Sequence, residues 1–412
     1  MVHIDTTGHR PTWAEIDLNA LAANFQIVRR LVDRDVKVMA VVKANAYGHG
    51  AVECARRLAA EGADWFGVAL PEEGIELRTA GITQPILCLS GFWAGQQNSL
   101  LQHKLTPVVY RIDMFESLDR AAHEAGVIVD AHLKIDTGMG RLGARFDQLS
   151  EFVDALRRFK HIRVDGLMTH LAAADDRSCA TLTADQIQRF ENAVALLRER
   201  GYTPTWRHLA NSAATFDQPS AWGNMVRPGG VLYGLWRDIL PPARVRTASG
   251  PGSPSGQPAW GGGSDRLGAA NDLLATSLNA VMYVRSRIAL LKWVPEGETI
   301  GYGCTYETSR KTLVATLPIG YNDGYLRGLS NRGRVIVRGT YASVIGRVSM
   351  DLTLVDVTDV EGVQLGDVVT LLGRDLDDPD LAVSAEDIAR TAGTLSYEVT
   401  CGISHRVPRS YL

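Results

Sequence analysis

The sequence predicts a TIM-type (β/α)8 barrel followed by a carboxyl-terminal domain built mainly of β-strands. The chain has 412 residues, more than a single hydrophobic core usually supports, so we expect two domains. Between Val36 and Gly230, short β-branched apolar runs alternate with longer segments of helical periodicity, which is the pattern of parallel strands joined by crossover helices. From about Leu278 onward, short β-rich runs follow one another, with no long helical pattern before Ala385–Ala392, which predicts an all-β domain.

The first half contains eight candidate strands, the number that closes a barrel of this type. The segments between them, such as 50–61, 114–125 and 184–200, are long enough for helices. Polar and glycine-containing clusters follow several strands, among them KANAYGHG, KIDTGMGR, THLAAAD, ANSAA and RPGG. We therefore expect the chemistry to gather at the carboxyl-terminal rim of the barrel. The candidate strands are 36–43, 65–69, 85–89, 105–110, 129–135, 164–169, 205–210 and 225–228.

The two halves are separated by a segment rich in Gly, Pro and Ser, most clearly over residues 248–268. This composition offers little material for a core and is typical of a linker or an insertion. We expect residues 1–240 to form the barrel domain, 241–275 the linker or insertion, and 276–412 the β domain. The amino-terminal run TWAEIDLNAL can pair with either half.

Composition argues against several classes of function. The net charge is −3, from 43 Lys and Arg against 46 Asp and Glu, and shows no bias toward nucleic acid or a membrane surface. The five cysteines are scattered and lack CxxC spacing, which argues against a disulfide framework and a structural zinc site. Neither a signal peptide nor an apolar run of about eighteen residues is recognisable. We expect a cytoplasmic protein with a small-molecule partner, no metal, and no nucleic-acid or membrane contact.

Lys43 ends the first apolar strand and is a candidate Schiff-base lysine. A lysine at this place is partly desolvated, which lowers its pKa and favours the neutral amine that attacks a carbonyl. Tyr47, Gly48 and Gly50 directly after it strengthen this interpretation. Taken alone, an ordinary strand-end cation facing water is the alternative.

The ends of the seventh and eighth strands are the places where barrels commonly bind a phosphate. Asn211 and Ser212 follow the seventh strand, and the RPGG run with Gly229 and Gly230 follows the eighth. Glycine lets the backbone approach a phosphate closely, and Ser212 supplies a hydroxyl donor. Both positions together indicate a phosphorylated cofactor, whereas for either position alone a turn or a helix cap is the favoured interpretation.

Arg227 bears on the kind of chemistry. Enzymes that use pyridoxal phosphate often place an acid beside the pyridine nitrogen to keep it protonated, and an arginine cannot take up that proton. The ring then withdraws fewer electrons, which favours return of the proton to the same carbon over transamination. Arg227 therefore favours racemisation. The alternative is a salt-bridged residue at a strand end.

Tyr302 is the candidate for a second proton-transfer group, because inverting a carbon requires groups on both of its faces. Lys43 supplies one face. Tyr302 lies in TIGYGCTYETSR, where the flanking glycines predict a tight, exposed turn. A phenol with a pKa near 10 is a poor base, so cations such as protonated His170 or Arg141 are needed nearby to lower that pKa. The alternative is an aromatic residue in a β-turn with its hydroxyl in water.

Eight segments in order resemble the alanine racemase family: AVVKANAYGHG, HLKIDTGMGRLG, ANSAA, MVRPGG, GYGCTYETSR, LPIGYNDGY, IGRVSMD and SYEV. The match runs from about Thr12 to the carboxyl end, and the first, second and fifth segments are the most specific. The resemblance implies pyridoxal 5'-phosphate as cofactor and a head-to-tail homodimer whose active sites take residues from both subunits. It also implies interconversion of L-alanine and D-alanine, which supplies D-alanine for peptidoglycan.

Matched residue by residue, the resemblance implies that Lys43 carries the cofactor and is the D-face base, that Tyr302 of the partner subunit is the L-face base, and that Arg227 contacts the pyridine nitrogen. Lys134 aligns with a lysine that carries a carbamate in many members and positions Arg141. The residues implied to hold the phosphate are Tyr47, Ser212, Gly229, Gly230 and Tyr397. The remaining implied roles are cofactor contact for His170 and Asn211, substrate-carboxylate contact for Arg141 and Met350, and the entrance for Tyr321 and Asp351.

The sequence departs from the family pattern at two places. Gly230 replaces a larger aliphatic residue, which bears on cofactor affinity, and the 248–268 stretch is longer than the usual connector between domains. Three other functions remain as alternatives. A decarboxylase of diaminopimelate or ornithine is expected to lack the GYGCTY turn. A pyridoxal-phosphate carrier protein ends after the barrel, and a racemase for serine, lysine or arginine differs only in a few pocket side chains.

Overall fold

Eight parallel strands form the barrel in the computed structural model, which describes residues 8–236 and 277–412. Each strand coincides with one of the eight predicted from the sequence, so the predicted fold class is confirmed. The two ends of the sheet meet through backbone hydrogen bonds from Asn224 to Arg207 and from Arg227 to Ala210, each 3.0 Å long. In spatial order the strands are β10 (Met225–Val226), β2 (Lys37–Val41), β3 (Trp65–Val68), β4 (Ile86–Cys88), β5 (Thr106–Val109), β6 (Val129–Asp136), β8 (Ile162–Met168) and β9 (Trp206–His208), and the short β7 (Ala144–Arg145) pairs with β6.

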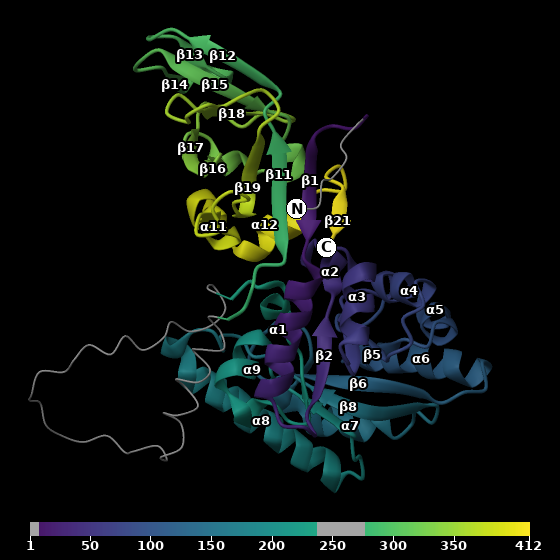
Figure 1. Cartoon of the computed structure of the whole chain (residues 1–412). Helices are drawn as coiled ribbons and strands as arrows, with labels where there is room; N and C mark the ends of the chain where they lie inside the picture. Colours follow the sequence, from purple (N-terminus) through teal and green to yellow (C-terminus); the bar gives the residue numbers. More distant parts are fainter. Residues whose placement is uncertain (1–7, 237–276) are drawn as a thin grey trace, which may run out of the picture.

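Helices cover the outside of the barrel (Figure 1). All three segments expected to be helical are helices, and the third begins earlier than predicted, at Ala180. None of the helices in the described ranges is both long and apolar enough to cross a membrane. Besides the short α2 (Lys43–Tyr47), the α-helices of this half are α1 (Leu18–Leu31), α3 (Ala51–Ala60), α4 (Pro71–Thr79), α5 (Gln97–Gln102), α6 (Ile112–Glu124), α7 (Leu149–Leu156), α8 (Ala180–Glu199) and α9 (Ser212–Asp217).

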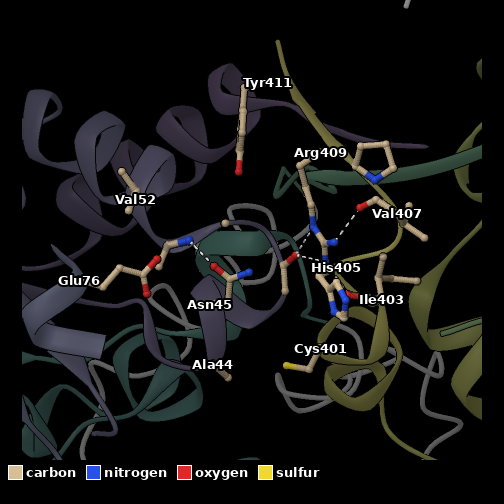
Figure 2. A pocket seen from close by; sticks show the side chains of 14 residues that line it. Ala44, Asn45, Val52, Glu76, Cys401, Ile403, His405, Val407, Arg409 and Tyr411 are labelled. Carbon is tan, nitrogen blue, oxygen red and sulfur yellow. Dashed lines mark hydrogen bonds between the residues drawn. The ribbon is translucent and has the colours of Figure 1, made fainter. Parts of the chain in front are cut away.

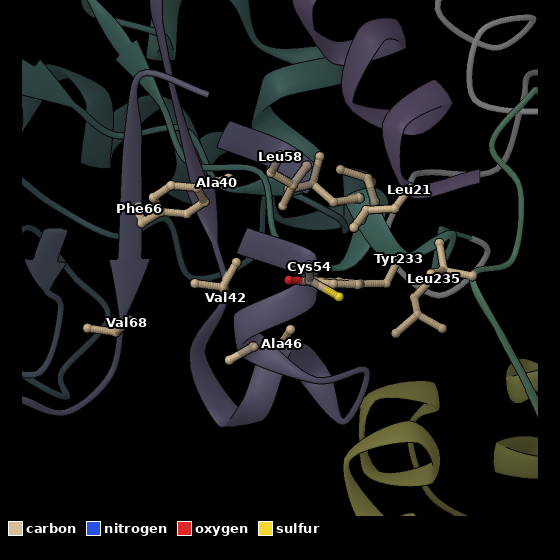
Figure 3. Packing of buried hydrophobic residues seen from close by; sticks show 14 of the residues in the cluster. Leu21, Ala40, Val42, Ala46, Cys54, Leu58, Phe66, Val68, Tyr233 and Leu235 are labelled. Carbon is tan, nitrogen blue, oxygen red and sulfur yellow. The ribbon is translucent and has the colours of Figure 1, made fainter. Parts of the chain in front are cut away.

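Side chains alternate between two cores along the barrel strands, because successive residues of a strand point to opposite faces. Ala40 of β2 and Val42 directly after it point outward and pack with Leu21 of α1 and Leu58 of α3 (Figure 3). Met39 and Val41, which alternate with them in sequence, point inward. The inner cluster is formed by Met39, Trp65, Leu87, Val108, Met168 and Met225. Because side chains alternate along a strand, the inward position of these residues determines which residues at the strand ends face the mouth of the barrel.

The second domain is built on a mainly antiparallel sheet, as its β-rich sequence predicts. The helix α11 (Ala385–Ala392) has the predicted bounds, but α12 (Ser396–Gly402) was not predicted, because seven residues are too few to show a helical period. In spatial order the strands are β12 (Leu290–Val294), β15 (Thr312–Leu317), β18 (Thr353–Asp356), β17 (Thr340–Val344), β16 (Arg334–Val337), β19 (Val368–Arg374), β11 (Met282–Arg287), β1 (Thr12–Ile16) and β21 (Arg409–Tyr411). β20 (Ala382–Val383) pairs with β19, and β13 (Thr299–Ile300) with β14 (Tyr306–Glu307).

The amino-terminal run pairs with this second sheet, which settles the choice that the sequence left open. β1 is antiparallel to β11 and parallel to β21, and the chain then enters the barrel as α1 (Figure 1). The predicted linker, including 248–268, lies within residues 237–276, outside the described ranges, and so do both predicted domain boundaries.

The carboxyl-terminal segment is fitted closely to the barrel residues that follow β2. Arg409 of β21 donates to the carbonyl oxygen of Gly48 from two nitrogens, at 3.2 and 3.0 Å, and also to carbonyl oxygens of its own segment, including that of Val407 (Figure 2). A Cβ on Gly48 would lie 2.1 Å from the carbonyl oxygen of Thr400. Gly48 also has a φ of 87°, so both backbone conformation and space require glycine there.

We predict that Gly166→Ala destabilises the barrel by about 1–3 kcal/mol, the usual cost of overpacking a core. A Cβ at this position on β8 would lie 2.3 Å from the buried ring of His132, which Trp65 and His208 confine. The free energy of unfolding is measured by denaturant titration. Gly402→Ala is the control, because Gly402 has no atom within 4 Å of the added Cβ. Equal unfolding midpoints for the two variants would contradict the prediction.

Candidate active site

The residues directly after Lys43 form a left-handed turn, which is rare for residues with side chains. Ala44, Asn45, Ala46 and Tyr47 have φ between 52° and 55°, within the short helix α2 (Lys43–Tyr47). Each such residue costs about 1–2 kcal/mol relative to a right-handed conformation. The surrounding contacts must therefore hold the turn in place.

Polar groups on several sides hold this turn. The side-chain oxygen of Asn45 accepts from the Ala51 amide at 2.8 Å and so joins the turn to α3. His49 contacts the carbonyl oxygens of Ala46 and Tyr47 through Nδ1, at 2.9 and 3.0 Å. Carbonyls only accept, so Nδ1 carries the proton. Burial lowers the pKa of His49 to about 4, and the ring is therefore neutral.

A cavity of about 680 Å³ opens at the carboxyl-terminal end of the barrel strands. The predicted clusters thus meet at one rim, as expected. The predicted site residues that line this cavity are Lys43, Tyr47, Lys134, Arg141, His170, Asn211, Ser212, Arg227, Gly229 and Tyr397.

Lys43 follows β2 and reaches the cavity because it continues the inward alternation of Met39 and Val41. Burial lowers the pKa of its amine, the nearby Arg141 lowers it further, and the carboxylate of Glu73 opposes both effects. A lower pKa raises the neutral fraction, which is the form that can attack a carbonyl or accept a proton.

Arg227, directly after β10, is buried and joins a chain of two histidines. Its guanidinium donates to Nδ1 of His208 at 2.9 Å and to the carbonyl oxygens of Thr169 and Leu209 at 2.7 and 3.0 Å. His208 Nε2 lies 2.8 Å from Nδ1 of His132. Because an arginine only donates, His208 must carry its proton on Nε2 and pass the hydrogen bond on to His132.

These buried histidines are neutral, and so is His170. Burial and the charge of Arg227 lower the pKa of His132 to about 3 and that of His208 well below its usual value. Burial, Arg227 and three further cations likewise depress the pKa of His170, whose Nδ1 lies 3.4 Å from the Arg227 guanidinium. A neutral His170 is therefore not the cation that would lower the pKa of the Tyr302 phenol. Desolvation beside Arg227 opposes a second positive charge.

The loops after β9 and β10 meet where a phosphate was predicted. The Gly229 amide donates to the Ser212 hydroxyl at 2.9 Å, and Asn211 rather than Ser212 caps helix α9. A Cβ on Gly229 would lie 2.4 Å from the hydroxyl of Tyr47, so only glycine allows this phenol to approach the loop. The Tyr47 ring centroid lies 5.4 Å from that of Tyr397. Hydroxyl and amide groups therefore gather at one end of the cavity.

Five predicted residues do not line this cavity. Gly230 begins a short buried 3-10 turn (Gly230–Tyr233). Tyr302 lies between β13 and β14, at the end of the second domain farthest from α2 (Figure 1). It is 74% exposed, as the predicted glycine turn requires, with φ of 75° and 72° at the flanking glycines. The other three, also exposed in the second domain, are Tyr321, Met350 and Asp351.

Sequence reasoning missed several residues of the site. His132 and His208 could have been found from the alternation along their strands. His132 shares the inward face of β6 with the predicted residue Lys134, and His208 shares that of β9 with Trp206, which packs against the inner cluster. Glu73 follows β3 at a position typical of a helix cap, a signal that does not point to Lys43. Cys401 lines the cavity only because α12 packs there. In the described ranges, no cluster of three metal-ligating side chains is present.

We predict that Lys134 makes the stability of the protein depend on pH between about 8 and 10.5. Burial first, and then Arg227, Arg141 and Lys43, lower its pKa from 10.5 to about 8. In this window the unfolded chain binds the proton and the folded chain does not, so the free energy of unfolding rises with pH, by on the order of 3 kcal/mol.

The measurement is denaturant unfolding of the cofactor-free protein in carbonate-free buffer across this pH window. Lys134→Met supplies the reference because it has no group to titrate there. Parallel curves for the wild-type protein and this variant would contradict the lowered pKa of Lys134.

Comparisons with known proteins cover nearly the whole chain. The family model for the alanine racemase N-terminal domain matches residues 16–236, and that for the alanine racemase C-terminal domain matches residues 281–411. An alanine racemase of Geobacter sulfurreducens is 43% identical over 405 residues, which span 98% of this chain and 97% of that protein. One of Halothermothrix orenii is 41% identical over 404 residues, with 98% and 97% covered.

Solved structures agree with these relatives. The alanine racemase of Clostridium difficile 630 superposes with a TM-score of 0.84 at 35% identity, covering 98% of this chain and 96% of that one. The alanine racemase of E. faecalis gives 0.83 at 32% identity, covering 98% and 99%. Two domain models in the predicted order and full-length relatives above 40% identity lead to one conclusion: the chain belongs to the alanine racemase family.

Proposed function

We propose that this protein interconverts L-alanine and D-alanine with pyridoxal 5'-phosphate, using Lys43 of one subunit and Tyr302 of the partner subunit as opposed proton-transfer groups. The observation that carries the proposal is the position of Lys43. Its amine has a lowered pKa and shares one cavity with the buried cation Arg227 and with the hydroxyl-lined loops after β9 and β10. Family membership supplies the substrate.

The residues of the cavity fit this cofactor. The hydroxyls of Tyr47 and Ser212 beside Gly229 suit a phosphate dianion, and the space over Gly229 is too small for any side chain. Arg227 suits the pyridine nitrogen, because it lines the cavity and its hydrogen-bond partners among the described residues are carbonyl oxygens and histidine rather than a carboxylate. When bound, the cofactor would withdraw electrons from the α-carbon of the substrate and so acidify its α-proton. Tyr397, His170 and Asn211 would complete the contacts.

Lys43 would move the proton on one face of the α-carbon. Its lowered pKa raises the fraction of the amine that is neutral, and the left-handed turn fixes the backbone from which it extends. Arg141, which lines the same cavity, would bind the carboxylate of the substrate. A carbamate on Lys134 would place an anion beside Arg141, and the pKa of about 8 leaves Lys134 enough neutral amine to form one.

A second subunit would complete the site. The β13–β14 hairpin, which carries Tyr302, lies at the far end of the second domain from α2 of its own chain (Figure 1), so the phenol that serves this cavity would come from another subunit. A head-to-tail dimer of twofold symmetry brings this exposed phenol to the cavity of the other subunit, twice. Met350 would then offer its backbone to the substrate carboxylate, and Tyr321 and Asp351 would border the entrance.

We predict that Lys43→Ala abolishes racemisation and the absorbance of the lysine-bound cofactor, because no other amine lies at that position. The measurement is a chiral assay of L- and D-alanine, extended to serine, lysine and arginine to define the substrate. Lys37→Ala is the control, since Lys37 lies at the opposite end of β2 and pairs with Asp64 at 2.9 Å. An active, yellow Lys43→Ala protein would refute the assignment.

We predict that Tyr302→Phe slows racemisation of L-alanine by about 100-fold or more, the usual contribution of a general base. Mixing this variant with Lys43→Ala should restore activity at about a quarter of the sites, because each mixed dimer contains one intact pair. Tyr306→Phe, in the same hairpin, is the control and should stay active. If mixing restores no activity although mass spectrometry shows that the subunits have exchanged, Lys43 and Tyr302 of one active site do not come from different subunits.

A further inference from the structure

Glu73 makes a bridge that a helix cap does not require. It is the third residue of α4, and one of its carboxylate oxygens accepts from the amides of Ala69 and Leu70, at 2.6 and 3.1 Å. This contact gives hydrogen-bond partners to backbone amides at the start of the helix, as a capping side chain usually does. The other oxygen accepts from the amide of Ala44 at 2.6 Å, in the left-handed turn. One carboxylate thus ties the end of β3 to the residue after Lys43.

The bridge acts where the backbone is most strained. Ala44 is the first of the four residues with positive φ, and its amide points to Glu73 rather than into the hydrogen-bonding pattern of an ordinary helix. A charge-assisted hydrogen bond at this amide is stronger than a neutral one. The bridge fixes the strand end to which the Lys43 side chain is attached, whereas Asn45 and His49 hold the later residues of the turn.

We propose that Glu73 is a positioning residue for Lys43, which acts by binding the Ala44 amide and the amides at the end of β3 with the two oxygens of one carboxylate. The inference rests on the proposed function, in which Lys43 is a proton-transfer group. Glu73 also supplies a negative charge near the amine. The other charged or titratable groups near that amine are Arg141, Lys134, His170 and Cys401.

Glu73→Gln is the deciding substitution. Glutamine is as good a cap as glutamate at the third position of a helix, so a residue that only caps α4 would tolerate it. Its amide has one accepting oxygen, and its NH2 group cannot accept from a backbone amide, so it can satisfy only one side of the bridge. Glu76→Gln is the matched control: it removes the same charge one helical turn later, from an exposed side chain.

Two readouts use the full-length protein without depending on its activity. Amide hydrogen exchange at Ala44 should become at least about tenfold faster in Glu73→Gln, as loss of a charge-assisted hydrogen bond implies. Acetylation of Lys43 in the cofactor-free protein, followed against pH by peptide mass spectrometry, should show a lower midpoint, because the anion that raises the pKa of Lys43 is gone. Glu76→Gln should match the wild-type protein in both.

In the holoenzyme, kcat should fall about tenfold or more while KM changes less than about twofold, since the lysine rather than substrate binding is disturbed. If Glu73→Gln does not fold, Glu73→Asp serves in its place, because the shorter side chain cannot reach both sides of the bridge. The proposal would be overturned if Glu73→Gln showed the same hydrogen exchange at Ala44 and the same acetylation midpoint of Lys43 as the wild-type protein. It would also be overturned if Glu76→Gln changed both quantities as much as Glu73→Gln does. Wild-type protein without racemase activity would instead refute the proposed function, and the exchange and acetylation results would still decide the role of Glu73.

Discussion

Four cationic side chains share one cavity, and this concentration of positive charge determines most of what the site can do. Lys43, Lys134, Arg141 and Arg227 all line it, and Asp175 is the one carboxylate among the described lining residues. Burial, together with the charges of the neighbouring cations, lowers the pKa values of both lysines and keeps His170 neutral. Such a cavity favours an anionic ligand, and a phosphate together with an amino-acid carboxylate would supply that charge.

Arg227 is the extreme case, because burial lowers even its pKa, to about 9. Its guanidinium is stabilised by two carbonyl oxygens and by the accepting nitrogen of His208. That nitrogen is available only while His208 stays neutral, and His208 in turn donates to His132. The positions of the protons on His208 and His132 therefore depend on Arg227. Gly166, which has no side chain, leaves the space that the His132 ring occupies.

The strained turn after β2 links the two domains to the site. It is held from the barrel by Asn45 and Glu73, and from the second domain by Arg409 and the close approach of Thr400 to Gly48. Strain of this kind persists only where the surroundings determine the backbone fully. The second domain thus has two tasks in the proposed dimer: it supports the lysine of its own chain and offers Tyr302 to the other.

Much of this protein follows from its sequence. Strand count, rim position and the identity of Lys43, Arg227 and the loops after β9 and β10 were predictable, because parallel strands alternate with helices and end at one edge. The exposed Tyr302 turn followed from its flanking glycines. Tertiary structure alone decided the rest: the bridge through Glu73, the packing of α12, and the side of the molecule on which Tyr302 lies. Sequence encodes local conformation and the period of each element, whereas burial, charge proximity and contacts between distant segments exist only once the chain is folded.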